Sequence, residues 1–178
     1  MSKTTSAAAF FFMAFVAGFL QNCVQPPDYP KEPVIEFLSI SPNVMLQRPF
    51  YVLPDSVTTT VTFSYTDGDG DLGYPGNDTA TSIIVRDART PQLARQYQLP
   101  YVDEQGAGNG ISGEVSLNIP IVCCIPDPLN GIPLPPCDTL SPSMQMRDTV
   151  VFIIQIKDRA GHLSNPIETA PLILICRR

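Results

Sequence analysis

The sequence predicts an all-β fold, a β-sandwich of about seven strands, from two features of residues 34–178. Short apolar or alternating runs recur along this region, and the 19 prolines and 11 glycines of the chain provide turns between strands. No stretch of ten or more residues after residue 33 shows the apolar period of a helix. At 178 residues, the chain has the length of one domain.

Seven segments carry the strand pattern. In 57–65 and 111–119, apolar side chains alternate with polar ones, as expected for strands with one buried face. The run 149–156 is apolar on both faces, which is typical of a central strand. Segment 95–102 contains Pro100, which favours a sheet edge. The other three segments are 34–40, 81–87 and 170–176.

The N-terminal region has the features of an export signal. Lys3 gives a weakly positive start, and residues 7–20 form an unbroken apolar run. This run has the length of a signal peptide and is shorter than the ~20 apolar residues that span a bilayer. Its position at the start of the chain and the polar, Pro-rich sequence after it favour export over a buried core helix.

The residues at 20–23, Leu-Gln-Asn-Cys, resemble the lipobox of bacterial lipoproteins. Asn22 stands where a small residue is usual, as in the looser boxes of Bacteroidetes lipoproteins. The resemblance implies a lipoprotein signal peptide at 1–22, then a lipidated Cys23 and a Pro-rich tether at 23–33. The protein would be held in the membrane of the bacterial cell envelope by its N-terminal lipid, with the outer membrane as the expected location. The alternative is ordinary signal cleavage, with Cys23 as a structural thiol.

The cysteine count supports lipidation. The chain has five cysteines, and lipidation of Cys23 leaves an even number for disulfides in an oxidising compartment. These four are Cys123, Cys124, Cys137 and Cys176. We expect one bridge from Cys123 or Cys124 to Cys137 and a second from the remaining thiol to Cys176. A vicinal bridge between the two adjacent cysteines is disfavoured by strain.

The C-terminal quarter, residues 150–175, resembles the last hairpin of bacterial immunoglobulin-like and fibronectin type III-like domains. In those domains a buried strand ends in Asp-x-Ala-Gly-Asn-x-Ser-Asn. The loop here is Asp-Arg-Ala-Gly-His-Leu-Ser-Asn at 158–165, with His162 in place of Asn. Together with FSYTDGDGDLG at 63–73, this hairpin is similar to uncharacterised Bacteroidetes lipoproteins with one such domain. The resemblance implies an immunoglobulin-like sandwich for 34–178.

Three aspartates follow the second predicted strand. Asp67, Asp69 and Asp71 have the spacing of the first three ligands of a calcium loop. The glycine and glutamate expected at the sixth and twelfth positions of an EF-hand are replaced by Leu72 and Asp78. The stretch is therefore not an EF-hand, although its aspartates remain suitable ligands for a hard cation.

If the strands alternate in direction, other loops return to the same pole, where the tether enters. The last hairpin loop would bring Asp158 beside the three aspartates. We therefore predict a Ca²⁺ site formed by Asp67, Asp69, Asp71 and Asp158. A solvated Asp-Gly turn is the alternative. Asp103, Glu104 and Asn165 on the returning loops, and Asp28 and Glu32 of the tether, are expected at the same pole.

Composition and motifs narrow the function. The net charge is −6 and the basic residues are scattered, which excludes a nucleic-acid-binding surface. No nucleophile motif surrounds His162, the one histidine of the chain, so we expect a binding or structural module and no enzyme. The alternatives are a small carbohydrate-binding module and a carbohydrate-active enzyme with paired carboxylates. The chain has no tryptophan for a sugar platform, and tyrosines would have to replace it.

A long segment, 125–147, separates two predicted strands. Loops of this length in a compact domain are usually functional or disordered, and Cys137 and the prolines disfavour disorder. We predict that Ile132 and Leu134, in GIPLPP, form an exposed apolar ridge for a partner protein of the envelope. Capping of the open end of the sandwich by these residues is the alternative.

Overall fold

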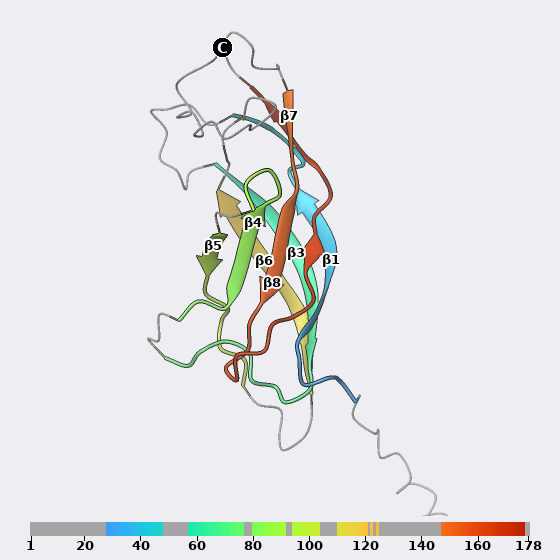
Figure 1. Cartoon of the computed structure of the whole chain (residues 1–178), viewed down its shortest axis with the longest axis vertical. Helices are drawn as coiled ribbons and strands as arrows, with labels where there is room; N and C mark the ends of the chain where they lie inside the picture. The colour runs from blue at the N-terminus through green and yellow to red at the C-terminus, as the bar shows by residue number, and fades with distance from the viewer. Residues whose placement is uncertain are drawn as a thin grey trace, which may run out of the picture.

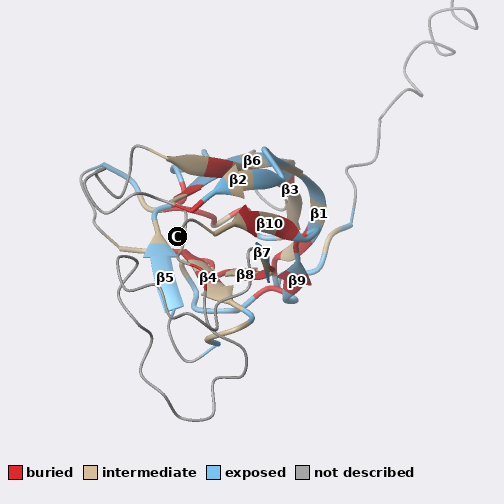
Figure 2. Cartoon of the chain, turned by 90° about the horizontal axis from the view of Figure 1, so that it is seen from above, coloured by how far each residue is buried: buried red, intermediate tan, exposed pale blue. Residues whose placement is uncertain are grey.

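The computed structural model shows an all-β fold in which strands form two facing layers (Figure 1, Figure 2). It describes residues 28–47, 57–76, 80–91, 94–103, 110–120, 122, 124 and 147–176. The β-sandwich predicted from the sequence is thus confirmed. Within these residues, no helix has the length and apolarity needed to cross a membrane.

The first layer contains three antiparallel strands in the order β1 (Val34–Ser41), β3 (Thr58–Asp67) and β6 (Ile111–Pro120). The central strand, β3, pairs with β1 on one side and with β6 on the other. Its buried apolar residues alternate with less buried polar residues, as predicted. The register of β1 shifts between Phe37 and Ser39. Leu38, at this bulge, is 46% exposed.

The second layer is built on two long, interrupted strands. β7 (Arg147–Val150) and β8 (Phe152–Ile156) form one of them, and β9 (Ile167–Glu168) and β10 (Leu172–Ile175) form the other. On one side, β8 pairs with β4 (Ile83–Asp87), which pairs with the edge strand β5 (Ala94–Tyr97). On the other side, β10 pairs in parallel with β2 (Val44–Leu46).

These pairings follow the immunoglobulin arrangement, in which the first, second and fifth strands face the third, sixth and seventh. The ten elements correspond to about seven strands, because the first strand divides between the layers as β1 and β2 and two later strands are interrupted. β2 was not predicted, and β5 ends at Tyr97 rather than at residue 102. The edge position predicted for β5 is confirmed.

The core lies between the two layers and draws on strands of both. Val61 and Phe63 on β3 belong to one buried cluster with residues of β8 and β10 that are equally inaccessible to solvent. β8 is central, as predicted, but only alternate residues are buried: Phe152, Ile154 and Ile156 face inward, whereas Ile153 and Gln155 are half-buried. The outer face of β8 is covered only by its neighbours in the sheet, since the described residues add no third layer.

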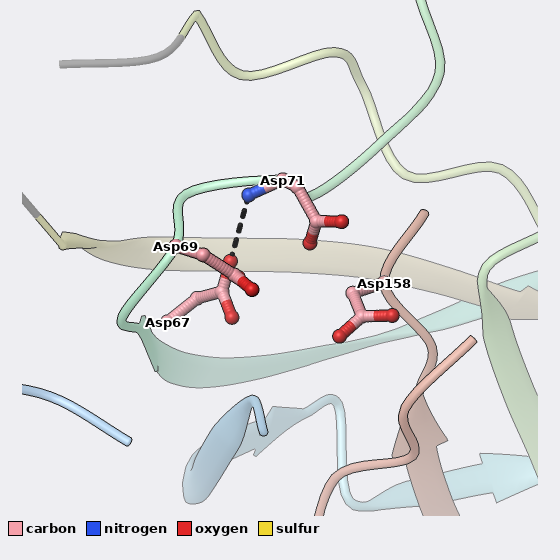
Figure 3. A group of neighbouring side chains, drawn as sticks. All are labelled: Asp67, Asp69, Asp71 and Asp158. Carbon is pink, nitrogen blue, oxygen red and sulfur yellow. Dashed lines mark hydrogen bonds between the residues drawn. The ribbon is translucent and has the colours of Figure 1, made fainter. Parts of the chain in front are cut away.

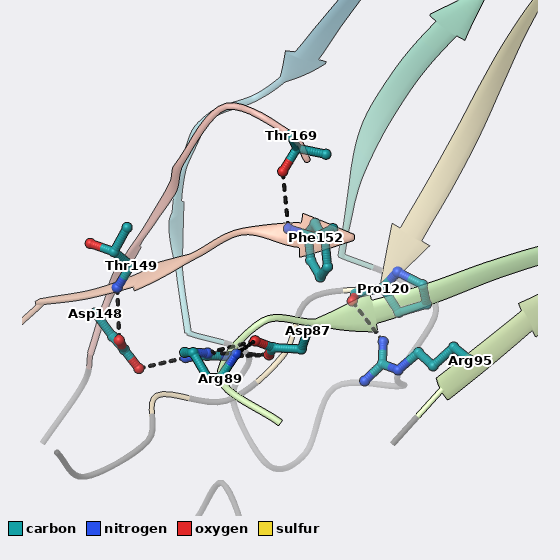
Figure 4. Close-up of polar contacts among 8 residues, drawn as sticks. All are labelled: Asp87, Arg89, Arg95, Pro120, Asp148, Thr149, Phe152 and Thr169. Atoms are coloured by element: carbon teal, nitrogen blue, oxygen red, sulfur yellow. Dashed lines mark hydrogen bonds and ion pairs between the residues drawn. The ribbon is translucent and has the colours of Figure 1, made fainter. Parts of the chain in front are cut away.

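Polar contacts, drawn in Figure 4, and a disulfide that the figure does not include close the end of the sandwich where β7 begins. The guanidinium of Arg89 donates to both carboxylate oxygens of Asp87 and pairs with Asp148, which joins the end of β4 to β7. Cys124, which follows β6, is bonded to Cys176 after β10, with 6.0 Å between their Cα atoms. This is one of the two pairings expected for Cys176.

Candidate metal centre

The first half of the site is the loop that follows β3. Asp67 ends the strand and is 0% exposed, and its Oδ2 accepts a hydrogen bond of 2.9 Å from the backbone N–H of Asp71. The N–H of Gly68 donates to the carbonyl of Pro30, and a Cβ on Gly68 would lie 2.3 Å from the carbonyl oxygen of Tyr29. The end of the predicted tether therefore packs on the loop, and only glycine fits at residue 68.

The second half is the hairpin loop after β8. Asp158 is 0% exposed, and its Oδ1 accepts from the N–H groups of Gly161 at 2.6 Å and His162 at 2.7 Å. Its Oδ2 lies 2.7 Å from Nδ1 of His162. Asp158 therefore fixes the turn of the last hairpin by accepting hydrogen bonds from its backbone, as short polar side chains commonly do in turns.

Two hydrogen bonds donated by backbone N–H groups hold the loops together. The N–H of Arg159 donates to the carbonyl of Asp71 at 3.2 Å, and the N–H of Ala160 donates to Oδ2 of Asp71 at 3.0 Å. The result is a cluster of four carboxylates, in which one oxygen from each residue lies within 4.8 Å of the others. Figure 3 shows Asp67, Asp69, Asp71 and Asp158 directed toward a common space.

Two oxygens of this cluster have no partner among the described residues. Oδ1 of Asp67 and Oδ1 of Asp71 are buried and accept no hydrogen bond there. A buried polar atom without a partner costs about 1–3 kcal/mol, and more when it carries charge. A cation at the centre of the cluster, or protons on these carboxyls, would satisfy both oxygens.

The electrostatics of the cluster agree with its geometry. Burial is the main cause that raises the pKa of Asp67 to about 6. The hydrogen bond from the N–H of Asp71 lowers this pKa, whereas the charges of Asp69, Asp71 and Asp158 raise it. Burial also raises the pKa of the Asp71 carboxyl, helped by the charges of Asp158 and Asp69. The hydrogen bond to Asp158 raises the pKa of His162. Protons and a metal cation would thus compete for the same carboxylates.

The spacing suits one hard cation. Ca²⁺ binds oxygens at about 2.3–2.6 Å, so two ligands on opposite sides of one ion are about 4.8 Å apart. All four carboxylate oxygens lie within that span. They would supply four of the 6–8 oxygen ligands that Ca²⁺ takes, and backbone carbonyls or water would supply the rest.

The structure brings together the four aspartates that the sequence analysis grouped as metal ligands. Asp28, Glu32 and Asp103 are described and lie outside the cluster. Asn165 has another role, since its side chain accepts from the N–H of Ile35 and donates to its carbonyl, both at 2.9 Å. It anchors the start of β1 to the last hairpin.

Several predicted residues fall outside the part of the chain that the structure describes. They are Cys23, Asp78, Glu104, Cys123, Ile132, Leu134 and Cys137. The lipidation site, the second disulfide and the apolar ridge therefore stay predictions.

Sequence reasoning missed the contributions of His162 and Arg159 to the centre. His162 was noted only as a departure from the hairpin pattern, although its position four residues after Asp158 is a usable signal for a contact within the turn. Arg159 had no signal in the sequence, because its contacts with Asp71, Leu72 and Gly73 cross between distant segments. Comparison of the chain with protein-family models, with curated proteins and with solved structures finds no match.

Proposed function

We propose that the chain is a lipid-anchored, non-catalytic β-sandwich module of the bacterial cell envelope, in which Ca²⁺ joins the two loops at the pole where the tether enters. The observation that carries this proposal is the pair of buried, unpartnered oxygens of Asp67 and Asp71 inside a cluster of four carboxylates. A cation there would satisfy both oxygens and cancel the repulsion. It would also link the loop after β3 to the hairpin after β8, which belong to different layers.

The same geometry argues against a carboxylate pair that hydrolyses glycosides. Such pairs flank a substrate at about 5–5.5 Å or 6.5–9.5 Å and must be open to it. Here four carboxylates converge within 4.8 Å, and Asp67 and Asp158 are 0% exposed. A binding or structural role therefore fits the site better than catalysis.

Calcium is expected to raise the melting temperature of the protein. A ligand that binds only the folded state stabilises it by about 2.7 kcal/mol at 100 times its Kd, which corresponds to about 5–10 °C for a domain of this size. The Asp69→Asn/Asp71→Asn variant should lose this rise, because it removes two of the four charged ligands. The measurement is thermal unfolding in calcium, in magnesium and in chelator.

Glu114→Gln is the matched control, since it removes a carboxylate from an exposed position on β6. This variant should keep the full response to calcium. Melting curves that are the same in calcium and in chelator for the wild type would show that the acidic loop is a solvated turn.

The Cys23→Ser variant is expected to leave the membrane fraction and to take up no labelled lipid, because the acyl chains are attached through this thiol. Fractionation of cells that express either form measures the change. An unchanged share of the variant in the membrane fraction would contradict the lipoprotein assignment without bearing on the cation site.

A further inference from the structure

The loop that carries the acidic cluster continues into a pocket. The pocket has a volume of 340 Å³ and is lined by Tyr74, Gly76, Ala80, Gln98, Leu99, Pro100 and Tyr101. This volume falls at the lower end of the range for small-molecule sites. We propose that this pocket binds a neutral saccharide, and that the cation holds one of its walls in place. The second part of the proposal rests on the proposed function.

The lining residues determine the class of ligand. None of them is charged, and two are tyrosines, which present an apolar ring together with a hydroxyl group. The guanidinium of Arg159 lies near the pocket, with its Cζ 5.3 Å from the centroid of the Tyr101 ring. Its Nη1 donates to the carbonyls of Leu72 and Gly73. It therefore acts as a support for Tyr101, and the four aspartates nearby disfavour an anion.

Exposure distinguishes a saccharide from a purely apolar ligand. Tyr101 is 42% exposed, although it is a large side chain at the pocket wall. An apolar ligand gains free energy mainly by leaving water, which an open site with exposed walls allows only in part. A pyranose ring has one apolar face of C–H groups and hydroxyls around its edge. It can stack on a tyrosine while its hydroxyls stay hydrated or bond to polar groups of the site.

The wall that carries Tyr74 continues directly from the cation loop. Leu72 is 0% exposed and its carbonyl accepts from the N–H of Val102. Gly73 has a φ of 70°, and a Cβ there would lie 2.2 Å from the carbonyl oxygen of Pro100. The backbone between Asp71 and Tyr74 therefore packs closely on the segment 100–102. A shift of Asp71 would also move residues that line the pocket.

Arg159 makes a second connection between the two sites. Its backbone N–H donates to the carbonyl of Asp71, which belongs to the cluster. Its side chain reaches the carbonyls of Leu72 and Gly73 and the ring of Tyr101. Its neighbour, Asp158, is one of the four carboxylates. Without a cation, repulsion between Asp71 and Asp158 would act on both ends of this connection. We therefore expect saccharide affinity to depend on calcium.

The test is titration of the mature, unlipidated Cys23→Ser chain in millimolar calcium with glucose, galactose, mannose, N-acetylglucosamine, maltose, cellobiose and lactose. Binding is followed by calorimetry and by tyrosine fluorescence, which is readable because the chain has no tryptophan. At least one neutral sugar should bind, and glucuronate should bind more weakly than glucose. Tyr74→Ala and Tyr101→Ala should each weaken binding about tenfold.

Further variants separate a lost contact from a lost fold. Tyr74→Phe and Tyr101→Phe keep the rings and should weaken binding by less than the alanine variants, with unchanged melting. Leu38→Ala, at an exposed position on the bulge of β1, should bind as the wild type does. The saccharide site is overturned if no sugar of this panel binds, or if a sugar that binds is indifferent to both tyrosines.

The dependence on calcium is measured separately. Addition of chelator, or the Asp69→Asn/Asp71→Asn substitution, should lower the affinity for the saccharide about tenfold. Equal saccharide affinity with and without calcium would contradict the coupling of the two sites, but it would not contradict saccharide binding in the pocket. A calcium-dependent rise in melting temperature without any bound sugar would uphold the cation site and reject the pocket, so the two failures are distinguishable.

Discussion

A chain that carries Cys124→Ala and Cys176→Ala is expected to have a free energy of unfolding about 4 kcal/mol below that of the wild type. The bond closes a segment in which the two cysteines are 52 residues apart, and the chain-entropy model gives about 4 kcal/mol for a loop of this length. Small domains are stable by about 5–15 kcal/mol. The disulfide therefore accounts for a large part of the stability of the fold.

The substitutions also affect the packing of the core. Cys124 is 2% exposed and belongs to the core, so alanine at this position also leaves a small void. Urea denaturation of both proteins, monitored by circular dichroism, gives the difference. Wild-type protein kept in reductant is a second comparison, which loses this bond together with any other disulfide of the chain and has no change of sequence. A difference below about 1 kcal/mol would contradict the entropic argument.

The fold was predictable where one strand face is buried and the segment is long. β3 and β6 alternate over ten residues each, and their bounds agree with the sequence patterns to within a few residues. β2 is three residues long, is half exposed at Val44 and Leu46, and pairs in parallel with β10 from the other end of the chain. Neither its period nor its flanking residues could reveal that pairing.

The site was predictable to the extent that topology determines it. Alternating strand directions are enough to bring the end of β3 and the end of β8 to one pole, and the aspartates lie at those two ends. Burial of Oδ1 on Asp67 and Asp71 is a property of the folded loops, which the sequence does not show. The hydrogen bonds between the side chain of Asn165 and the backbone of Ile35 join segments that are far apart in the sequence, so no local pattern could reveal them.

The second large effect is a loss of stability as pH rises when no divalent cation is present. The pKa of Asp67 is raised to about 6 in the folded protein, against about 3.9 for an ordinary aspartate. The folded state therefore holds a proton that the unfolded state releases, so stability is fully present below about pH 4 and falls through pH 6. The full difference corresponds to about 3 kcal/mol, and solvent screening reduces the expected loss to about 2 kcal/mol.

The raised pKa values of Asp71 and His162 act in the same direction. Calcium should reverse the trend above pH 6, since the deprotonated carboxylates are its ligands and binding stabilises the folded state. The measurement is the free energy of unfolding at pH 4, 5, 6 and 7, in chelator and in calcium.

Asp67→Asn separates this effect from general acid behaviour. The amide can still accept the hydrogen bond from the N–H of Asp71 but neither titrates nor contributes a charged ligand. This variant should therefore show a smaller loss between pH 4 and 6 and little response to calcium, whereas Glu114→Gln should follow the wild type. If the wild type in chelator becomes more stable from pH 4 to pH 6, the buried carboxylate of Asp67 is already compensated by groups of the protein. In that case the cluster has no need of a cation.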